Sequence, residues 1–304
     1  MDNYKRIFTE DKDGNIEYVT VIGDKEDIKI VKKYSQEQMN IIKQKEDLHS
    51  YSQELGGFIH MMYVNNELLF SDVCVDRGNI SRLIYLATYI DYNNREENVL
   101  VKHGENNKVI YMTKKDIRDI MNLSDTTFKG FIKDMKDNDL LWEVDGKFYV
   151  SNKYFSKGKT TFDKGTYTRV FINTTRELYL GCSSRQHKKL SYVFQLIPYL
   201  NYETNILCSN PNEVDEHKLK KLGLEDICTL LGLCCDKKSM NRFEHDLYKI
   251  TITINDKEYY MFSRVIVKGG HGKNDYFVIN PNIIWNGSKI DNIAKTIEWL
   301  YFDR

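Results

Sequence analysis

Apolar positions between Thr113 and Leu141 follow the spacing of two short helices. They fall three and four residues apart, at Ile117, Ile120, Met121, Phe128, Phe131, Ile132 and Met135. Thr113 can cap the first helix and Ser124 or Asp125 the second, with Leu123 between them. The pattern predicts a helix-turn-helix, whose second helix can lie in a DNA major groove. The alternative interpretation is a plain helical hairpin inside a core.

The residues that follow favour the first interpretation. Alternating apolar positions at Leu140, Trp142 and Val144 lead to the turn Asp145-Gly146, after which Phe148 and Val150 alternate back. Helix, turn, helix and β-hairpin in that order predict a winged helix.

The same order of patterns recurs later in the chain. Residues 224–231 have helical spacing, Asp236 can cap a helix over residues 237–248, and alternation from Ile250 to Ser263 follows. With the glycine-rich loop 269–272, we interpret this as a second winged helix with a longer wing. The two halves also end alike, as FYVSN (148–152) before Gly158 and FVINP (277–281) before Gly287. Such a repeat supports a tandem.

The expected fold class is therefore α+β, with two tandem winged helix-turn-helix domains and a helical N-terminal extension. Residues 1–34 suggest a small β-hairpin or a loose arm, and 35–54 a polar helix. The predicted division is an arm and connecting helix (1–55), winged-helix domain 1 (56–158), a basic connector (159–189), winged-helix domain 2 (190–290) and a C-terminal helix (291–304). Within the connector, residues 167–172 alternate as a strand, and Leu190 is expected to open a core helix.

DNA contacts are expected from residues that point away from the apolar stripe of each second helix, from the connector and from the wing. Helix residues near the N-terminus would approach base edges, while lysines further along would meet phosphates. The candidates are Thr126, Thr127, Lys129, Lys133 and Lys136, then Arg185, Lys188 and Lys189, then Lys237, Lys238, Ser239, Asn241 and Arg242, and in the wing Lys268 and Lys273. Asn241 and Arg242 can read adenine and guanine in a bidentate manner. The alternative is that these charges form an ordinary solvated helix face.

The charge of one segment supports DNA binding, whereas the net charge of the whole chain does not. The formal net charge is zero. The segment 157–189, however, carries eight basic residues against Asp163 and Glu177, a local charge of +6.

Motifs for catalysis, metals or nucleotides are missing from the sequence. It contains no H-E-x-x-H, no G-x-S-x-G and no histidine pair at ligand spacing, and loop 268–274 lacks the P-loop pattern. We therefore expect no enzymatic activity, cofactor or metal. There is no secretory signal and no run of eighteen apolar residues, so a cytoplasmic protein with no membrane association is expected.

The chain also resembles a group of proteins borne by phages and plasmids of low-GC Gram-positive bacteria. The resemblance covers about residues 56–290. It rests on the segments GGFIHMMYV, SRLIYLATYIDYN, MTKKDIRDIMNLSDTTFKGF, NKYFSKGK, HKKLSYVFQLIPYLNYETNILCSNP and VINPNIIWNG. The tandem architecture is similar to that of the two-winged-helix initiators that bind repeated sites in plasmid origins.

This resemblance implies sequence-specific binding of double-stranded DNA at a phage or plasmid replication origin. One alternative is a transcriptional regulator of a mobile element, and another is a protein-interaction module that targets a host factor. Expected partners are double-stranded DNA, a second copy in a homodimer, and a host replication or transcription protein. The DNA site, the oligomeric state and the host partner are not determined by the sequence.

Overall fold

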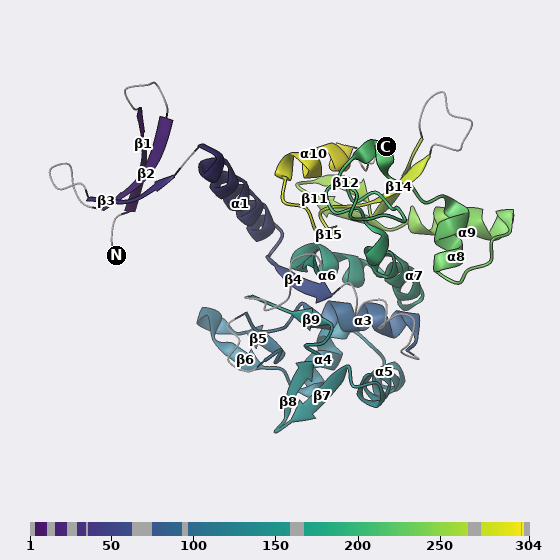
Figure 1. Ribbon diagram of the computed structural model, residues 1–304. Helices are drawn as coiled ribbons and strands as arrows, with labels where there is room; N and C mark the ends of the chain where they lie inside the picture. The colour runs from purple at the N-terminus through teal and green to yellow at the C-terminus, as the bar shows by residue number, and fades with distance from the viewer. Residues whose placement is uncertain are drawn as a thin grey trace. The chain divides into compact units, whose positions relative to one another are not determined.

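The computed structural model describes residues 4–10, 16–22, 29–34, 36–62, 75–92, 97–158, 167–266, 275–298 and 300 (Figure 1). The fold is a mixture of helices and small antiparallel sheets. The chain forms two compact units, one of residues 1–51 with 288–290, and the other of residues 52–287 with 291–304. None of the helices in the described ranges is long and apolar enough to cross a membrane.

The first unit begins with three antiparallel strands, β1 (Tyr4–Glu10), β2 (Ile16–Ile22) and β3 (Lys29–Tyr34), in that order. This is one strand more than the predicted hairpin. The predicted turn at Gly14-Asn15 lies outside the described residues. Helix α1 (Gln36–Glu54) follows. After its end, Gly56 and Gly57 have φ angles of 78° and 79°.

A four-stranded antiparallel sheet lies at the centre of the second unit. Its order is β15 (Ile284–Trp285), β10 (Tyr167–Phe171), β4 (Phe58–Met62) and β9 (Phe155–Ser156). Strand β10 belongs to the segment 159–189 that the sequence suggested as a connector. That interpretation is wrong for residues 167–189. Thr168, Val170 and Phe171 are buried, and β10 pairs with strands on both sides, so the segment is part of the core.

The first helix-turn-helix region follows α3 (Arg77–Ala87). A short hairpin of β5 (Val101–His103) and β6 (Val109–Tyr111), joined by η1 (Glu105–Asn107), leads into α4 (Lys114–Met121). Helix α5 (Asp125–Asp137) comes next, then the hairpin β7 (Leu141–Val144) and β8 (Lys147–Val150). The predicted helices and hairpin are therefore present at the predicted positions.

The second region begins with α6 (Ile172–Gly181) and α7 (Ser184–Gln195) and continues through η2 (Ile197–Tyr199) and η3 (Glu216–Lys218). Helices α8 (Leu224–Leu230) and α9 (Lys237–Leu247) lie where the sequence predicts the second helix-turn-helix. Helix α7 starts six residues before the predicted start at Leu190. The cause is a capping box, in which the Ser183 N–H and hydroxyl both donate to Gln186 Oε1 at 2.9 and 2.7 Å.

Two separate hairpins follow α9, where the sequence suggested one long wing. Strands β11 (Thr251–Ile254) and β12 (Lys257–Tyr260) form the first. Strands β13 (Phe262–Val265) and β14 (Tyr276–Ile279) form the second, before β15 and α10 (Ile290–Glu298). The glycine-rich loop 269–272 lies outside the described residues, between β13 and β14 in the sequence, and β11–β12 is an additional hairpin.

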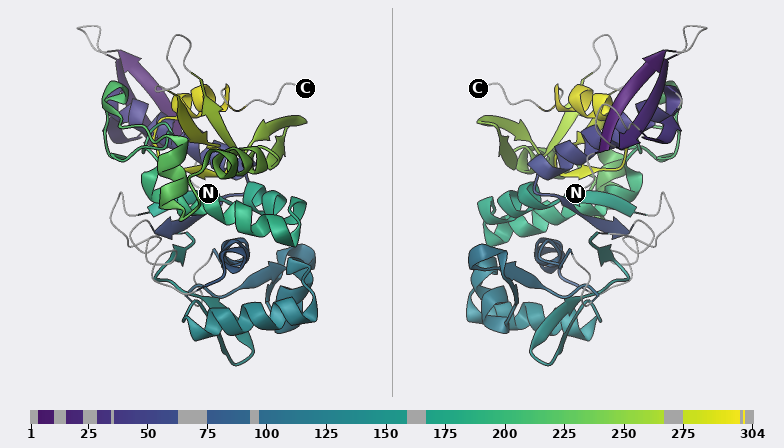
Figure 2. Two further views of the ribbon diagram at one scale, coloured as in Figure 1. Left: turned by 90° about the vertical axis from the view of Figure 1, so that its right-hand side faces the viewer. Right: turned by 90° about the vertical axis from the view of Figure 1, so that its left-hand side faces the viewer.

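Matching backbone pairs show that the two halves share one plan. Leu141 pairs with Val150 at the base of the hairpin β7–β8, and Phe262 pairs with Ile279 at the base of β13–β14. The Leu100 N–H donates to Phe148 O at 2.8 Å, and likewise the Leu207 N–H donates to Phe277 O at 2.8 Å. Figure 2 shows the blue and teal elements of the first half on one side of α7 and the yellow-green elements of the second half on the other.

The halves nevertheless share one hydrophobic core. A single cluster of buried side chains extends from Ile59 on β4 through α3 and α7 to Ile284 on β15. Tyr85 of α3 stacks on Tyr179 of α6, with ring centroids 3.9 Å apart and an angle of 11° between the rings. Both rings are almost fully buried. Such close packing holds the halves together as one unit.

Candidate nucleic-acid interface

Helix α4 and helix α5 are held at their starts by side-chain caps. The Asp116 N–H donates to the Thr113 hydroxyl at 3.2 Å, and the Thr113 N–H donates to Asp116 Oδ2 at 2.8 Å. Asn122 ends α4 in the left-handed conformation, and Ser124 caps α5. The apolar face of α5 is buried through Phe128, Phe131, Ile132 and Met135, so its polar face is turned outward.

The residues of α5 that were predicted to contact DNA differ in their exposure and in their existing contacts. Thr126, Lys129 and Lys133 are exposed. Thr127 is half-buried, with its hydroxyl 2.9 Å from that of Ser124, so it takes part in the cap. Lys136 is exposed, but its Nζ lies 3.0 Å from Glu143 Oε2 on β7. Only the first three therefore offer an uncommitted side chain to a ligand.

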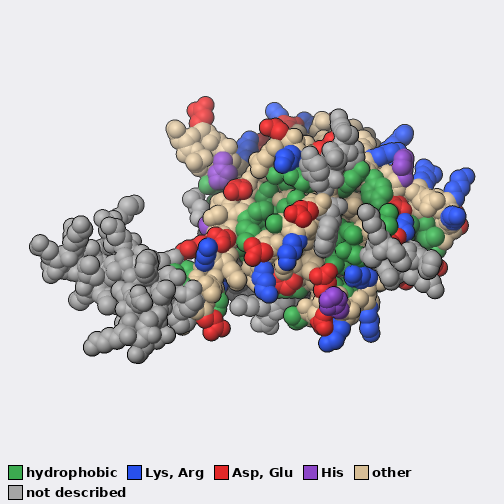
Figure 3. All heavy atoms as spheres, turned by 90° about the horizontal axis from the view of Figure 1, so that it is seen from above, with side chains coloured by type: hydrophobic (Ala, Val, Ile, Leu, Met, Phe, Trp, Pro, Cys, Tyr) green, Lys and Arg blue, Asp and Glu red, His purple; other side chains and the backbone are tan. Residues whose placement is uncertain are grey.

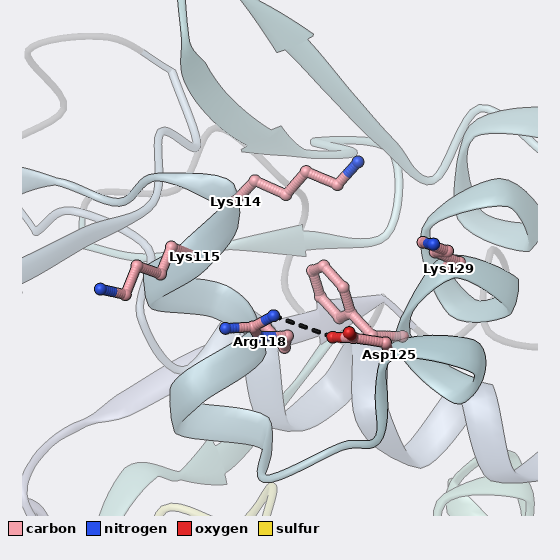
Figure 4. Close-up of a pocket in the computed structure, with 6 residues that line it drawn as sticks. Lys114, Lys115, Arg118, Asp125 and Lys129 are labelled. Atoms are coloured by element: carbon pink, nitrogen blue, oxygen red, sulfur yellow. Dashed lines mark hydrogen bonds and ion pairs between the residues drawn. The ribbon is translucent and has the colours of Figure 1, made fainter.

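A hollow of about 420 Å³ lies between the N-terminal parts of α4 and α5. Figure 4 shows Arg118 and Asp125 pointing toward one another there, and Arg118 Nη1 lies 2.8 Å from Asp125 Oδ1. Lys114, Lys115 and Lys129 also line it. The sequence analysis missed the three cations of α4, although their i, i+1 and i+4 spacing opposite buried Ile117 is visible in the sequence.

The capping carboxylate of α4 is firmly ionised. Partial burial alone would raise the pKa of Asp116. Hydrogen bonds from Lys102 and from the backbone and hydroxyl of Thr113 instead lower it to about 2. Lys102 Nζ lies 2.5 Å from Asp116 Oδ1 and ties β5 to the start of α4. The position of α4 is thus fixed independently of pH near neutrality.

The second helix-turn-helix uses an acidic cap. Asp236 Oδ1 accepts the N–H groups of Lys238 and Ser239, each at 3.0 Å. Hydrogen bonds from the side chains of Ser239 and Cys234, and from the Ser239 backbone, lower the pKa of Asp236 to about 2. Asp236 therefore stays charged at the positive end of α9.

Helices α7 and α9 bring two groups of predicted residues together. Arg185, Lys188 and Lys189 of α7 line a hollow of about 340 Å³ with Ser239 and Arg242 of α9. Lys189 Nζ lies 2.8 Å from Asp246 Oδ2, and Arg242 Nε lies 3.9 Å from the same oxygen. Asp246 thus partly neutralises the hollow, while Arg185 and Lys188 stay exposed.

The remaining predicted residues fall into two groups. Lys237, Lys238 and Asn241 are exposed on α9, and the Arg242 side chain is 83% exposed. Lys268 and Lys273 lie outside the described residues. Seen from above, Lys and Arg side chains project along the right-hand edge, the side on which α8 and α9 lie in Figure 1 (Figure 3).

The two helix-turn-helix regions differ in the charge of their first helix. Lys114, Lys115 and Arg118 make the exposed face of α4 basic, whereas Glu225 and Asp226 stand at the start of α8. Basic side chains thus stand on both helices of the first pair, whereas in the second pair they stand on α9 and not on α8.

Comparisons with known proteins identify no relative. No family model, curated protein or solved structure matches this chain. Within the part of the chain that the structure describes, no three or more His, Cys, Asp or Glu side chains are grouped to hold a metal ion.

Proposed function

We propose that both halves are winged helix-turn-helix units and that the protein binds double-stranded DNA in a sequence-specific manner. The observation that carries the proposal is a capped helix-turn-helix present twice, each with exposed cations or amides on its second helix. In each half, the strand segment before the two helices is hydrogen-bonded to the hairpin after them, through Leu100 and Phe148 or Leu207 and Phe277. Helix, strand, helix, turn, helix and hairpin in this order match a winged helix.

The exposed side chains divide into two roles in this proposal. Asn241 and Arg242 on the second turn of α9 read base edges, because an amide and a guanidinium can each form two hydrogen bonds to adenine and guanine. Lys129 and Lys133 on α5, with Arg185 and Lys188 on α7, contact phosphates. A neutral chain can bind DNA in this way where cations gather locally, as Arg185, Lys188 and Arg242 do around the hollow between α7 and α9.

The biological site that we propose is a replication origin of a phage or plasmid. The presence of two reading units in one chain supports a composite site, as in the two-winged-helix initiators that this architecture resembles. Direct repeats beside the gene favour this role. An inverted repeat over its own promoter favours transcriptional regulation instead.

Protein binding is the second candidate, and one observation favours it. Trp142 and Val144 on β7 are 38% and 50% exposed, which is high for apolar side chains on a short hairpin. The Trp142 ring stacks on Tyr149, with centroids 6.0 Å apart. An exposed apolar patch of this kind suits a protein partner better than a phosphate backbone.

The test is binding of the whole protein to DNA that flanks its own gene, measured across about 50–200 mM salt, where phosphate contacts weaken steeply. Selective binding with a steep salt dependence supports the proposal. The double variant Lys237→Ala/Arg242→Ala should lower affinity at least about tenfold. The matched control Lys220→Ala/Lys295→Ala removes the same charge from exposed positions away from α9 and should have little effect. Absence of selective binding at about 50–100 mM salt would exclude DNA recognition and favour the protein-binding candidate.

A further inference from the structure

The central sheet carries a local two-fold axis that relates the two halves. In the β4–β10 pair, His60 lies opposite Arg169. On the outer side of β4, His60 pairs with Ser156, and on the outer side of β10, Arg169 pairs with Trp285. The next pairs are Met61 with Phe155 and Val170 with Ile284. Exchanging β4 with β10 and β9 with β15 therefore turns each of these pairings into another. A rotation of about 180° through the His60–Arg169 pair exchanges these pairings with one another.

In each half, a carboxylate on the second helix contacts the helix that precedes the helix-turn-helix. In the first half, Asn79 Nδ2 of α3 donates to Asp134 Oδ2 of α5 at 2.7 Å. In the second half, Lys189 Nζ of α7 lies 2.8 Å from Asp246 Oδ2 of α9. Asp134 and Asp246 stand ten residues after Ser124 and Asp236, the caps of their own helices. Equivalent carboxylates thus fasten α5 to α3 and α9 to α7. Their partners are not equivalent, since Asn79 stands three residues after the cap Asp76 and Lys189 six residues after the cap Ser183.

Each helix-turn-helix is also fastened to the opposite half. The Tyr179 hydroxyl of α6 donates to Met121 O at the end of α4, at 3.2 Å. Arg77 Nη2 of α3 donates to Leu231 O at the end of α8, at 2.7 Å. Met121 and Leu231 are equivalent, since each stands four residues after the buried isoleucine of its helix, Ile117 or Ile227. These bonds and the shared core fix the two turns relative to one another.

We infer that one chain binds a single DNA site composed of two half-sites in opposite orientation and at a fixed spacing. This inference rests on the proposed function. A two-fold axis in a DNA-binding protein is mirrored in its site, and here one chain supplies both of the units that a symmetric dimer would supply. The rigid connection between the halves leaves no linker to absorb a change in spacing.

The two half-sites differ in sequence, because the positions of α5 that correspond to exposed positions of α9 carry different side chains. Counting from the caps Ser124 and Asp236, Thr126 corresponds to Lys238, Lys129 to Asn241 and Gly130 to Arg242. The natural site is therefore not a palindrome, and its two-fold arrangement is hidden from inspection of the DNA sequence.

A variant with the same exposed residues on α5 and α9 tests the orientation of the two half-sites. Thr126→Lys/Lys129→Asn/Gly130→Arg gives α5 the reading residues of α9. All three positions are exposed, and a Cβ at Gly130 meets no atom within 4 Å. Selection of tight binders from a random pool of duplex DNA should then yield an inverted repeat. A direct repeat, or one isolated half-site, would overturn the inference while leaving sequence-specific binding in place.

Two further measurements keep the test decisive. The reciprocal variant Lys238→Thr/Asn241→Lys/Arg242→Ala places the α5 set on α9 and should also select an inverted repeat, of different sequence. With the unaltered protein, insertion of five or ten base pairs at the centre of its selected site should lower affinity at least about tenfold. Tolerance of either insertion contradicts the fixed spacing. Failure of the unaltered protein to select any sequence rejects the proposed function itself and not merely the arrangement.

Discussion

Asn98 and Asn205 occupy the same place in the two halves and make the same bond. Both backbones are left-handed, with φ angles of 57° and 54°. Asn98 Nδ2 donates to Phe155 O at 2.7 Å, and Asn205 Nδ2 donates to Ile284 O at 2.6 Å. Both side chains are buried. Each asparagine thus joins the strand segment before its helix-turn-helix to the strand that closes its half.

Replacement of either asparagine by alanine should destabilise the protein. The lost hydrogen bond leaves a buried carbonyl unpaired, at about 1–3 kcal/mol, and alanine with positive φ costs about 1 kcal/mol more. Asn98→Gly should avoid only the backbone cost, because glycine adopts a positive φ without strain. Urea unfolding measures the free energy. Asn106→Ala is the matched control, because Asn106 has φ of 56° but is exposed, and it should lose only the backbone part. Equal losses for Asn98→Ala and Asn106→Ala would contradict the role of the buried bond.

His60, on the central strand β4 opposite Arg169, should make stability depend on pH. Burial, and next the nearby Arg169 guanidinium, lower the pKa of His60 from 6.5 to about 4. Between these values the unfolded chain binds a proton that the folded chain does not, so stability is lost as pH falls from 6.5 toward 4. The expected loss between pH 7 and pH 5 is about 2 kcal/mol.

Urea unfolding at both pH values measures this loss, and His60→Gln should reduce it by that amount. Burial also lowers the pKa of His187, so part of the pH dependence should remain in the variant. An unchanged pH dependence in His60→Gln would show that His60 is not the titrating group. His217→Gln, at an exposed position, is the matched substitution control.

Asp246→Asn should tighten DNA binding. Burial alone would raise the pKa of Asp246, but Lys189, Lys249 and Arg242 lower it, so the carboxylate is charged at pH 7. Its removal frees Lys189 and Arg242 for phosphates and should increase affinity for nonspecific duplex about three- to tenfold at low salt. Fluorescence anisotropy measures the affinity. Glu216→Gln removes one negative charge from an exposed position on η3, and an equal effect there would argue against a local role of Asp246.

Tyr179→Phe should weaken the junction between the halves without disturbing its packing. The variant keeps the stack on Tyr85 but removes the donor to Met121 O, which should cost about 1–2 kcal/mol. Tyr92→Phe is the control, because Tyr92 is 68% exposed, and it should change stability by less than about 0.5 kcal/mol. Thermal and urea unfolding measure the stability of the two variants. A loss of stability no larger than that of the control would show that the Tyr179 hydroxyl does not stabilise the end of α4.

The local elements followed from the sequence because their signals are local. The spacing of Ile117, Phe128 and Met135 and the caps Thr113 and Ser124 lie within a few residues of the helices they determine. The segment FYVSN recurs as FVINP and identified the equivalent hairpins that begin at Leu141 and Phe262. The second strand of each hairpin has the same alternation of side chains, so the two segments share one apolar pattern.

Only the tertiary structure decided how the halves combine. Residues 159–189 looked like a basic connector because their charges are dense, yet Val170 and Tyr179 are buried by partners far away in the sequence. The pairing of His60 with Arg169, and the contact of Lys189 with Asp246, join positions 109 and 57 residues apart. No periodicity records such pairings, because they depend on which surfaces meet when the whole core forms. The sequence by itself determined two pairs of short helices and the outward face of each second helix, and the shared core determined how the two halves pack on one another.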